Sequence, residues 1–175
     1  MAVPRLCDTR NLLPPPLPEH FFEQADGLAA HHQARLVDLR RAISAAYYGL
    51  FHFTLAAAAN MIVGEAERSP ARYSLVYRSV EHSRLRGLCK KLSATEPDLP
   101  LAPSGGFGKV AEFARVAGNL SELRNVADYE PLRDFTREDA LFAISEAREA
   151  IKWFQQGTVE QQEAFLMLLL FRSRT

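Results

Sequence analysis

The sequence predicts an all-α protein: an up-and-down antiparallel helical bundle with an extra C-terminal helix. Apolar residues recur at steps of three and four in successive segments, and no segment alternates with a period of two. A hydrophobic content of 47% over 175 residues is enough for one buried core. We therefore expect one bundle domain at residues 19–157, between a proline-rich tail at 1–18 and an apolar helix at 158–175 that packs on the bundle or on a partner.

The first two helices are expected between residues 19 and 63. The prolines of LLPPPLPE, residues 12–19, prevent helix formation until they end. The helix that follows contains Gly27, which weakens it without ending it. The next helix, residues 33–63, carries two adjacent apolar stripes and ends at Gly64. Because so much of its circumference is apolar, we expect it to be the central helix.

The remaining helices are predicted by the same periodicity and by capping signals. They are expected at residues 71–92, 109–128, 136–156 and 159–171. Thr136, followed three residues later by Asp139, has the pattern of a capping box. The terminal segment FLMLLLF has more adjacent apolar residues than one face of a short helix can bury, which predicts exposed apolar surface for a partner.

Composition argues against several classes of protein. With 21 basic and 21 acidic side chains the net charge is zero, so the surface as a whole does not suit binding to a long nucleic acid. The basic face predicted at 71–92 still allows a local contact with a nucleic acid. Cys7 and Cys89 match no metal or redox spacing, which predicts free thiols in a reducing compartment. No secretory leader is recognisable, and the longest apolar runs are too short for a bilayer core of about 30 Å. We expect a cytoplasmic protein without a metal, a cofactor or a membrane contact.

Polar and aromatic side chains interrupt the central helix within RRAISAAYYGLFHF. Spaced at steps of three, four and four, one face carries Arg41, Ser44, Tyr48 and His52. Buried polar groups need hydrogen-bonding partners, and the candidate partners are Arg124 and Asp128 at the end of another apolar stripe. Two interpretations are open: a core network closed by a helix-end salt bridge, or a ligand-binding site.

The same segments resemble a known family. RRAISAAYYGLFH, followed by LRNVADYEP and FTREDALFAISEAREAIKWF, resembles the HEPN superfamily, and in particular its small bacterial members with an AYYALFH-like helix and an R-x-x-A-D-Y ending. The resemblance covers about residues 19–156. It implies a helical bundle that forms a homodimer and has a function linked to nucleotides or RNA.

The resemblance also implies a role for the end of the fourth helix. Catalytic relatives are metal-independent endoribonucleases whose motif begins with arginine and a polar residue and ends in histidine, and two copies meet across the dimer. Arg124 and Asn125 match the start of this motif, but residues 126–132 contain no histidine. Cleavage without a metal needs groups that exchange protons near neutrality, which Asp128 and Tyr129 do less well than histidine. The catalytic candidates are therefore Arg124, Asp128 and Tyr129.

Ligand binding requires fewer functional groups than catalysis does. Arg124 suits a phosphate group, and a tyrosine ring at position 47, 48 or 129 can stack on a base. His52 and His82 are the histidines that neighbouring helices can bring to the site. The ligand-binding candidates are Arg41, Ser44, Tyr47, Tyr48, His52, His82 and Asn125.

Three interpretations of function follow. The missing motif histidine favours a non-catalytic module that binds a nucleotide, RNA or a nucleotidyltransferase partner, as some members of the superfamily do, in a toxin–antitoxin or defence setting. The alternative is a metal-independent endoribonuclease with an altered site. The third is an oligomerisation scaffold, which the apolar terminal segment supports.

Overall fold

The structure is a computed structural model that describes residues 17–30, 34–64, 70–94 and 99–171. Within these ranges the chain forms seven helices and no strand, which confirms the predicted all-α class. The helices are α1 (Pro18–Ala30), α2 (Leu36–Val63), α3 (Pro70–Tyr77), α4 (His82–Leu92), α5 (Gly108–Tyr129), α6 (Arg137–Gln156) and α7 (Val159–Leu170). The predicted proline-rich tail up to residue 16 and Cys7 lie outside the described residues.

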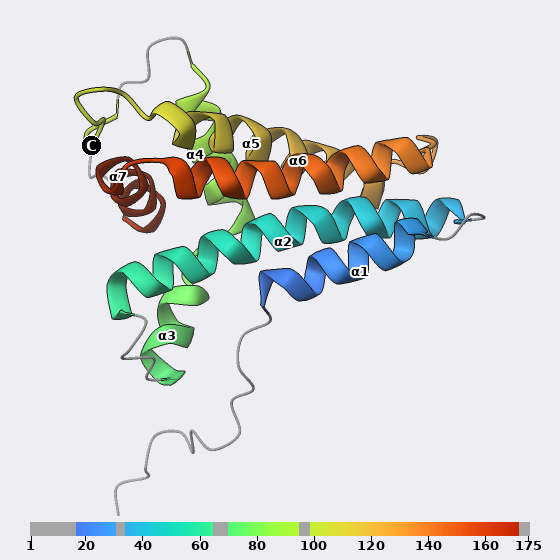
Figure 1. Ribbon diagram of the computed structural model, residues 1–175, viewed down its shortest axis with the longest axis horizontal. Helices are drawn as coiled ribbons and strands as arrows, with labels where there is room; N and C mark the ends of the chain where they lie inside the picture. The colour runs from blue at the N-terminus through green and yellow to red at the C-terminus, as the bar shows by residue number, and fades with distance from the viewer. Residues whose placement is uncertain (1–16, 31–33, 65–69, 95–98, 172–175) are drawn as a thin grey trace, which may run out of the picture.

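Four long helices, α1, α2, α5 and α6, form a bundle in which the pairs α1–α2, α2–α5 and α5–α6 run antiparallel, whereas α2 and α6 pack side by side and run parallel (Figure 1). As predicted, α2 is central: it packs against α1, α5 and α6, and 14 of its 28 residues are buried. By length and composition α2 would also pass as a membrane span, but 72% of its most apolar window is buried inside the fold. Such burial is what a core helix requires.

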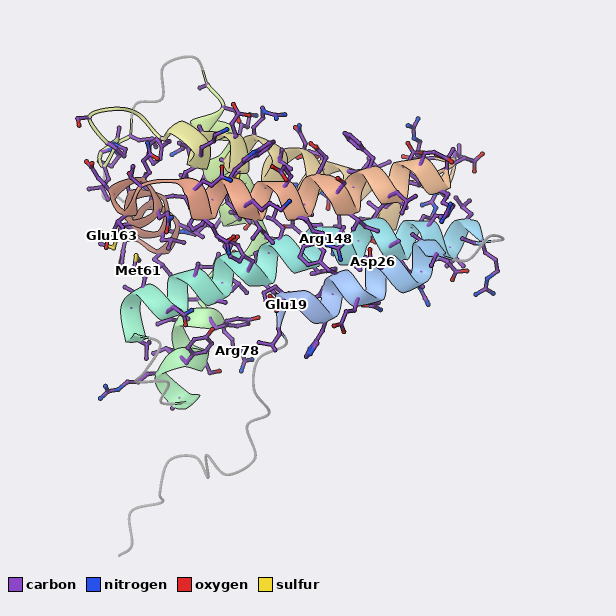
Figure 2. All side chains as sticks on the ribbon, in the orientation of Figure 1. Glu19, Asp26, Met61, Arg78, Arg148 and Glu163 are labelled. Atoms are coloured by element: carbon purple, nitrogen blue, oxygen red, sulfur yellow. The ribbon has the colours of Figure 1, made fainter. Side chains whose placement is uncertain are left out.

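Small residues let α1 and α2 approach closely. A Cβ atom at Gly49 of α2 would lie 2.9 Å from the ring of Phe22 on α1. Alanines fill much of the same layer, including Ala25 and Ala29 of α1 and Ala42 and Ala46 of α2, all with no exposed surface. α1 is also tied to α6, where Arg148 donates to both carboxylate oxygens of Asp26, at 3.1 and 2.6 Å (Figure 2).

The start of α6 has the cap that the sequence predicts. Thr136 Oγ1 accepts a hydrogen bond from the backbone N–H of Asp139 at 3.1 Å, and the Asp139 carboxylate accepts from the backbone N–H of Thr136 at 2.8 Å. This reciprocal pair is a capping box, and it satisfies two backbone donors at the helix end.

The single helix predicted at residues 71–92 is wrong, because the chain leaves helical geometry between α3 and α4. Ser79 Oγ donates to the carbonyl of Val76 at 2.7 Å, and Glu81 is extended, with φ −97° and ψ 152°. Serine hydroxyls compete in this way with the helical hydrogen-bond ladder. The break lets α3 stay on α2 while α4 packs on α5 and α7, a change of partner that one straight helix does not allow.

The terminal apolar helix packs on the bundle, one of the two outcomes that the sequence predicts, and it leaves part of its apolar surface exposed. α7 crosses the end of the bundle (Figure 1), and it buries Ala164, Phe165, Leu166 and Leu169. Phe165 meets Phe113 and Phe154 edge to face, at centroid distances of 5.4 and 5.9 Å. Met167 and Phe171 are 38% and 55% exposed. α7 contacts α2, α4 and α5 at once, so the bundle covers one of its faces.

The close α1–α2 contact predicts opposite effects for two glycine substitutions. Gly49→Ala should lower the free energy of unfolding by about 1–2 kcal/mol, because overpacking against Phe22 exceeds the gain in helix propensity. Gly27→Ala is the control, since its Cβ would meet nothing within 4 Å, and it should raise stability by about 0.5–1 kcal/mol. Urea denaturation measures both, and equal effects would contradict the packing argument.

Candidate functional site

The polar row of α2 meets the end of α5. Ser44 Oγ donates to Asp128 Oδ1 at 2.5 Å, and one turn further along, Tyr48 Oη accepts from Arg124 Nη2 at 2.5 Å. Arg124 Nε lies 2.8 Å from Asp128 Oδ2, so the two α5 residues also form an ion pair. The structure thus confirms Arg124 and Asp128 as partners for two members of the α2 row, Ser44 and Tyr48.

The guanidinium group of Arg124 is held from several sides. Nη1 donates to Asn125 Oδ1 at 3.2 Å, and the guanidinium carbon lies 5.3 Å from the ring centroid of Tyr48 and 5.7 Å from that of Tyr129. Burial opposes the charge of Arg124, but the Tyr48 hydrogen bond and the Asp128 carboxylate outweigh it, so the pKa of Arg124 lies above its ordinary value. Arg124 therefore carries a fixed positive charge between two aromatic rings.

The site is partly open to solvent. The Arg124 side chain is 16% exposed, that of Asp128 is 27% exposed, and Tyr129 is 74% exposed. Arg124 Nε is buried and makes no hydrogen bond among the described residues, although the Asp128 oxygen lies close to it. The ion pair is thus an electrostatic contact without a well-directed hydrogen bond, and a ligand oxygen from the open side can compete with Asp128.

His82, the first residue of α4, lies in the same cluster. Its Nδ1 is 2.9 Å from Tyr47 Oη, its ring stacks on Phe51 at 3.9 Å, and it meets the Tyr48 ring edge to face at 5.6 Å. Burial, and after it the positive charge of Arg124, lower the pKa of His82. The neutral ring is therefore favoured beside the arginine.

His52 lies one turn beyond Tyr48 and has a separate set of contacts. Its Nδ1 is 2.5 Å from Tyr77 Oη of α3, and its ring stacks on Phe21 of α1 at 4.4 Å with an interplanar angle of 10°. Burial and then the neighbouring His82 lower the pKa of His52 from 6.5 to about 4. His52 is a neutral structural link between α1, α2 and α3.

Two of the predicted ligand-binding residues have other roles. Tyr47 is only 1% exposed, and burial raises the pKa of its hydroxyl to about 12, so Tyr47 is a core residue that holds His82 rather than a stacking surface. Arg41 is exposed and makes no side-chain hydrogen bond or ion pair with another described residue. The prediction that Arg41 joins the buried row is wrong.

Its neighbour Arg40 takes the position that the sequence analysis gave to Arg41. Arg40 Nη1 donates to the carbonyl of Ala127 and Nη2 to that of Glu130, both at 2.7 Å, and Nη2 also donates to the carbonyl of Arg133. The carbonyls of Ala127 and Glu130 lie at the C-terminal end of α5, where a cation is favourable, and that of Arg133 lies in the loop that follows. The signal was present, because Arg40, Ser44 and Tyr48 are spaced four and four.

The sequence analysis also missed residues that position the cluster from other helices. Phe21, Phe51 and Tyr77 contact the two histidines, and Ser121 hydrogen-bonds with Tyr47. All four fit the helical pattern of their segments, so no sequence signal identified them as part of a site. In the part of the chain that the structure describes, no group of three or more His, Cys, Asp or Glu residues could hold a metal ion.

Comparison with known proteins adds no assignment: no protein-family model, curated protein or solved structure matches the chain. The kind of ligand that the site suits is therefore inferred from the geometry of the site. A fixed arginine charge, a competing carboxylate, an exposed tyrosine ring and a neutral histidine suit a ligand that combines an anionic group with a flat ring.

The contrast between two adjacent arginines gives a second prediction. Arg40→Ala should lower the free energy of unfolding by about 1–3 kcal/mol, because it removes charge-assisted hydrogen bonds at the end of α5. Arg41→Ala is the matched control and should change it by less than about 0.5 kcal/mol, because Arg41 is exposed and unpaired in the described part of the chain. A larger loss for Arg41→Ala in chemical denaturation would contradict the assignment.

The neutral histidines give a third prediction. Because the pKa of His52 is lowered from 6.5 to about 4 in the folded chain, the unfolded chain binds more protons in this window. Stability should be complete above about pH 6.5 and should fall as the pH approaches 4. Thermal unfolding midpoints of the wild type and of His52→Gln measure this, since acidic groups titrate in both proteins. The wild type should lose more stability than the variant on acidification, and parallel curves would contradict the prediction.

Proposed function

We propose that the chain is a HEPN-like module that binds single-stranded RNA or a nucleotide and does not cleave it. The observation that carries this proposal is the placement of the Arg124 guanidinium between the rings of Tyr48 and Tyr129, with Tyr129 largely exposed. A base can stack on the open ring of Tyr129 while its phosphate meets Arg124, because aromatic side chains and arginine recognise unpaired nucleotides in this way.

The charge distribution supports an anionic ligand that competes with Asp128. In the free chain Asp128 neutralises Arg124, and Ser44 holds the other carboxylate oxygen. Arg41 is exposed on α2, one turn from Ser44, and adds a cation without an ion-pair partner among the described residues. A phosphate at the open side would therefore meet the charge of Arg124 beside that of one carboxylate, which favours moderate binding.

The histidines support binding rather than cleavage. Both His52 and His82 face a tyrosine hydroxyl through Nδ1, and the pKa of His52, about 4, is too low for proton exchange near neutrality. The segment from Val126 to Leu132 adds no histidine. Tyr129 and Asp128 serve in this proposal as a stacking surface and as the counter-charge of Arg124.

One observation favours the alternative function of an endoribonuclease. The His82 ring lies against Tyr48, whose hydroxyl accepts from Arg124, so a neutral histidine and an arginine share one cluster. A neutral histidine can accept a proton from a ribose hydroxyl, and the arginine can stabilise the developing negative charge. Here the histidine would come from α4 rather than from the end of α5.

A homodimer is part of the proposal. Large apolar side chains other than Tyr129 are exposed at the bundle end that carries the site: Leu36, Val37 and Leu132, with exposed fractions of 38%, 44% and 90%. Exposed apolar groups beside a polar site are typical of interfaces. The same surface suits a nucleotidyltransferase partner. The scaffold interpretation keeps some support, because α7 buries four of its 12 residues on the bundle while Met167 and Phe171 stay exposed.

Binding of a labelled single-stranded RNA, measured by fluorescence anisotropy in chelator, tests the proposal. Tyr129→Ala should weaken binding by about 1–3 kcal/mol, because it removes one stacking surface. Phe142→Ala on α6 is the matched control, since Phe142 is also an exposed ring, 65% exposed, and it should leave binding unchanged. Equal affinities for wild type and Tyr129→Ala, or no binding by the wild type, would refute the proposed site.

A cleavage assay on the same purified protein separates the two functions. A mixed RNA pool in chelator should remain intact with the wild type. Cleavage by the wild type that is lost in Arg124→Ala and His82→Ala, both shown to be folded by circular dichroism, would establish the endoribonuclease instead. Asp128→Ala should then change activity as well, because Asp128 sets the charge of Arg124.

A further inference from the structure

A second feature lies between α4 and α5, outside the contacts of the Arg124 site. The two helices leave an open groove with a volume of about 620 Å³. In the described part of the chain, its walls carry three cations, Arg86 and Lys90 from α4 and Arg115 from α5, and one acid, Glu122. Such a concentration of positive charge contrasts with the zero net charge of the whole chain. The groove is thus the place where a polyanion would be favoured locally.

The cations of the groove are only partly neutralised. Arg86 lies 3.9 Å from Glu122, and Arg115 Nε lies 3.1 Å from Glu112; the side chains of both pairs are 47–67% exposed. Exposed ion pairs of this kind contribute little and exchange readily for another anion. Lys90 is exposed and makes no ion pair with any described residue. All three cations are therefore available to a ligand.

Uncharged residues with small side chains form the floor of the groove. Gly87 and Gly118 line it, and a Cβ atom at Gly87 would meet nothing within 4 Å. Cys89 lies between them with 1% exposure, and burial raises the pKa of its thiol to about 12, so the floor carries no thiolate. A ligand can therefore approach the helix backbones with its neutral parts while its charges face the cations on the walls.

The groove begins beside the candidate functional site. Ser83 and Glu122 line its near end. Ser83 follows His82 directly in α4, and Glu122 lies one turn before Asn125 in α5. From Ser83 the groove follows α4 to Ser93, a length of about 15 Å at 1.5 Å per residue. One flexible ligand can occupy the site and the groove together.

We propose that this groove binds the sugar-phosphate backbone of a single-stranded RNA whose terminal base occupies the Tyr129–Arg124 site. This inference rests on the proposed function. Phosphates would pair with Arg86, Lys90 and Arg115, while riboses lie over the glycine floor. A single strand fits better than a duplex, because the cations line one short groove, whereas duplex RNA is read across about 16 base pairs. An acidic peptide shares the charge but not the continuity with an aromatic site.

The salt dependence of RNA binding tests the groove directly. Each phosphate contact on a single strand contributes about 0.7 to the slope of log affinity against log salt concentration. The double variant Lys90→Ala, Arg115→Ala should therefore reduce the slope by about 1.4, measured by anisotropy between about 50 and 200 mM salt. The control double variant is Lys91→Ala, Lys109→Ala, which removes the same charge from exposed positions of the same two helices outside the groove lining.

Two further variants test the acidic residue of the groove and the occupancy of the groove. Glu122→Gln should tighten binding, because it removes the acid that lines the groove among the described residues and frees Arg86. Gly87→Leu should weaken binding without a loss of thermal stability, because its side chain enters the open groove from a helix that tolerates it well. Unchanged affinity in Gly87→Leu, or an equal loss of slope in both double variants, would overturn the proposal.

The outcomes separate this inference from the proposed function. If Tyr129→Ala weakens binding and the groove variants do not, the RNA-binding site stands and the groove proposal falls. If the wild type does not bind the RNA at all, both fall. Displacement of bound RNA by polyglutamate at equal charge concentration, with the groove variants resistant to it, would assign the groove to an acidic protein segment and overturn RNA as its occupant.

Discussion

The burial of α2 is the constraint on which the rest of the structure depends. Other helices cover this helix along most of its length, yet it carries hydroxyl, phenol and imidazole groups that need partners. A buried polar group left without a hydrogen bond costs about 1–3 kcal/mol, a large share of the 5–15 kcal/mol by which a domain is stable. The positions of α3, α4 and the end of α5 follow from this need, because Tyr77, His82 and Arg124 supply the partners.

The network that stabilises the fold also sets the chemistry of the site. Arg124 is oriented by Tyr48 and Asn125 and is neutralised by Asp128, so its charge is present but shielded. Burial keeps the two histidines neutral. A site built in this way has little long-range attraction for an anion. The cationic groove between α4 and α5 lies a short distance away and offers that attraction. The site and the groove together therefore suit an anionic ligand better than either does alone.

Much of the fold could be predicted from local sequence patterns. Apolar periodicity gave the long helices, and Thr136 with Asp139 gave the cap of α6, because both signals act within a few residues. The predictions were wrong or left open where partners decide the outcome. The helix at 71–92 breaks because α3 and α4 pack on different helices, and α7 buries one face on the bundle itself because it contacts three of its helices. The periodicity of each segment alone predicts neither outcome.

The same division holds for the site. The sequence by itself determined that α2 carries a polar row and that Arg124 and Asp128 share one face of α5, because helix geometry fixes residues four apart. Only the tertiary structure decided that Arg40 rather than Arg41 reaches the end of α5, that Tyr47 is a core residue, and that His82 lies beside Tyr48. The reason is physical: helical periodicity leaves the rotation of α2 uncertain by about one residue, or 100°, and only packing against α1, α5 and α6 fixes it.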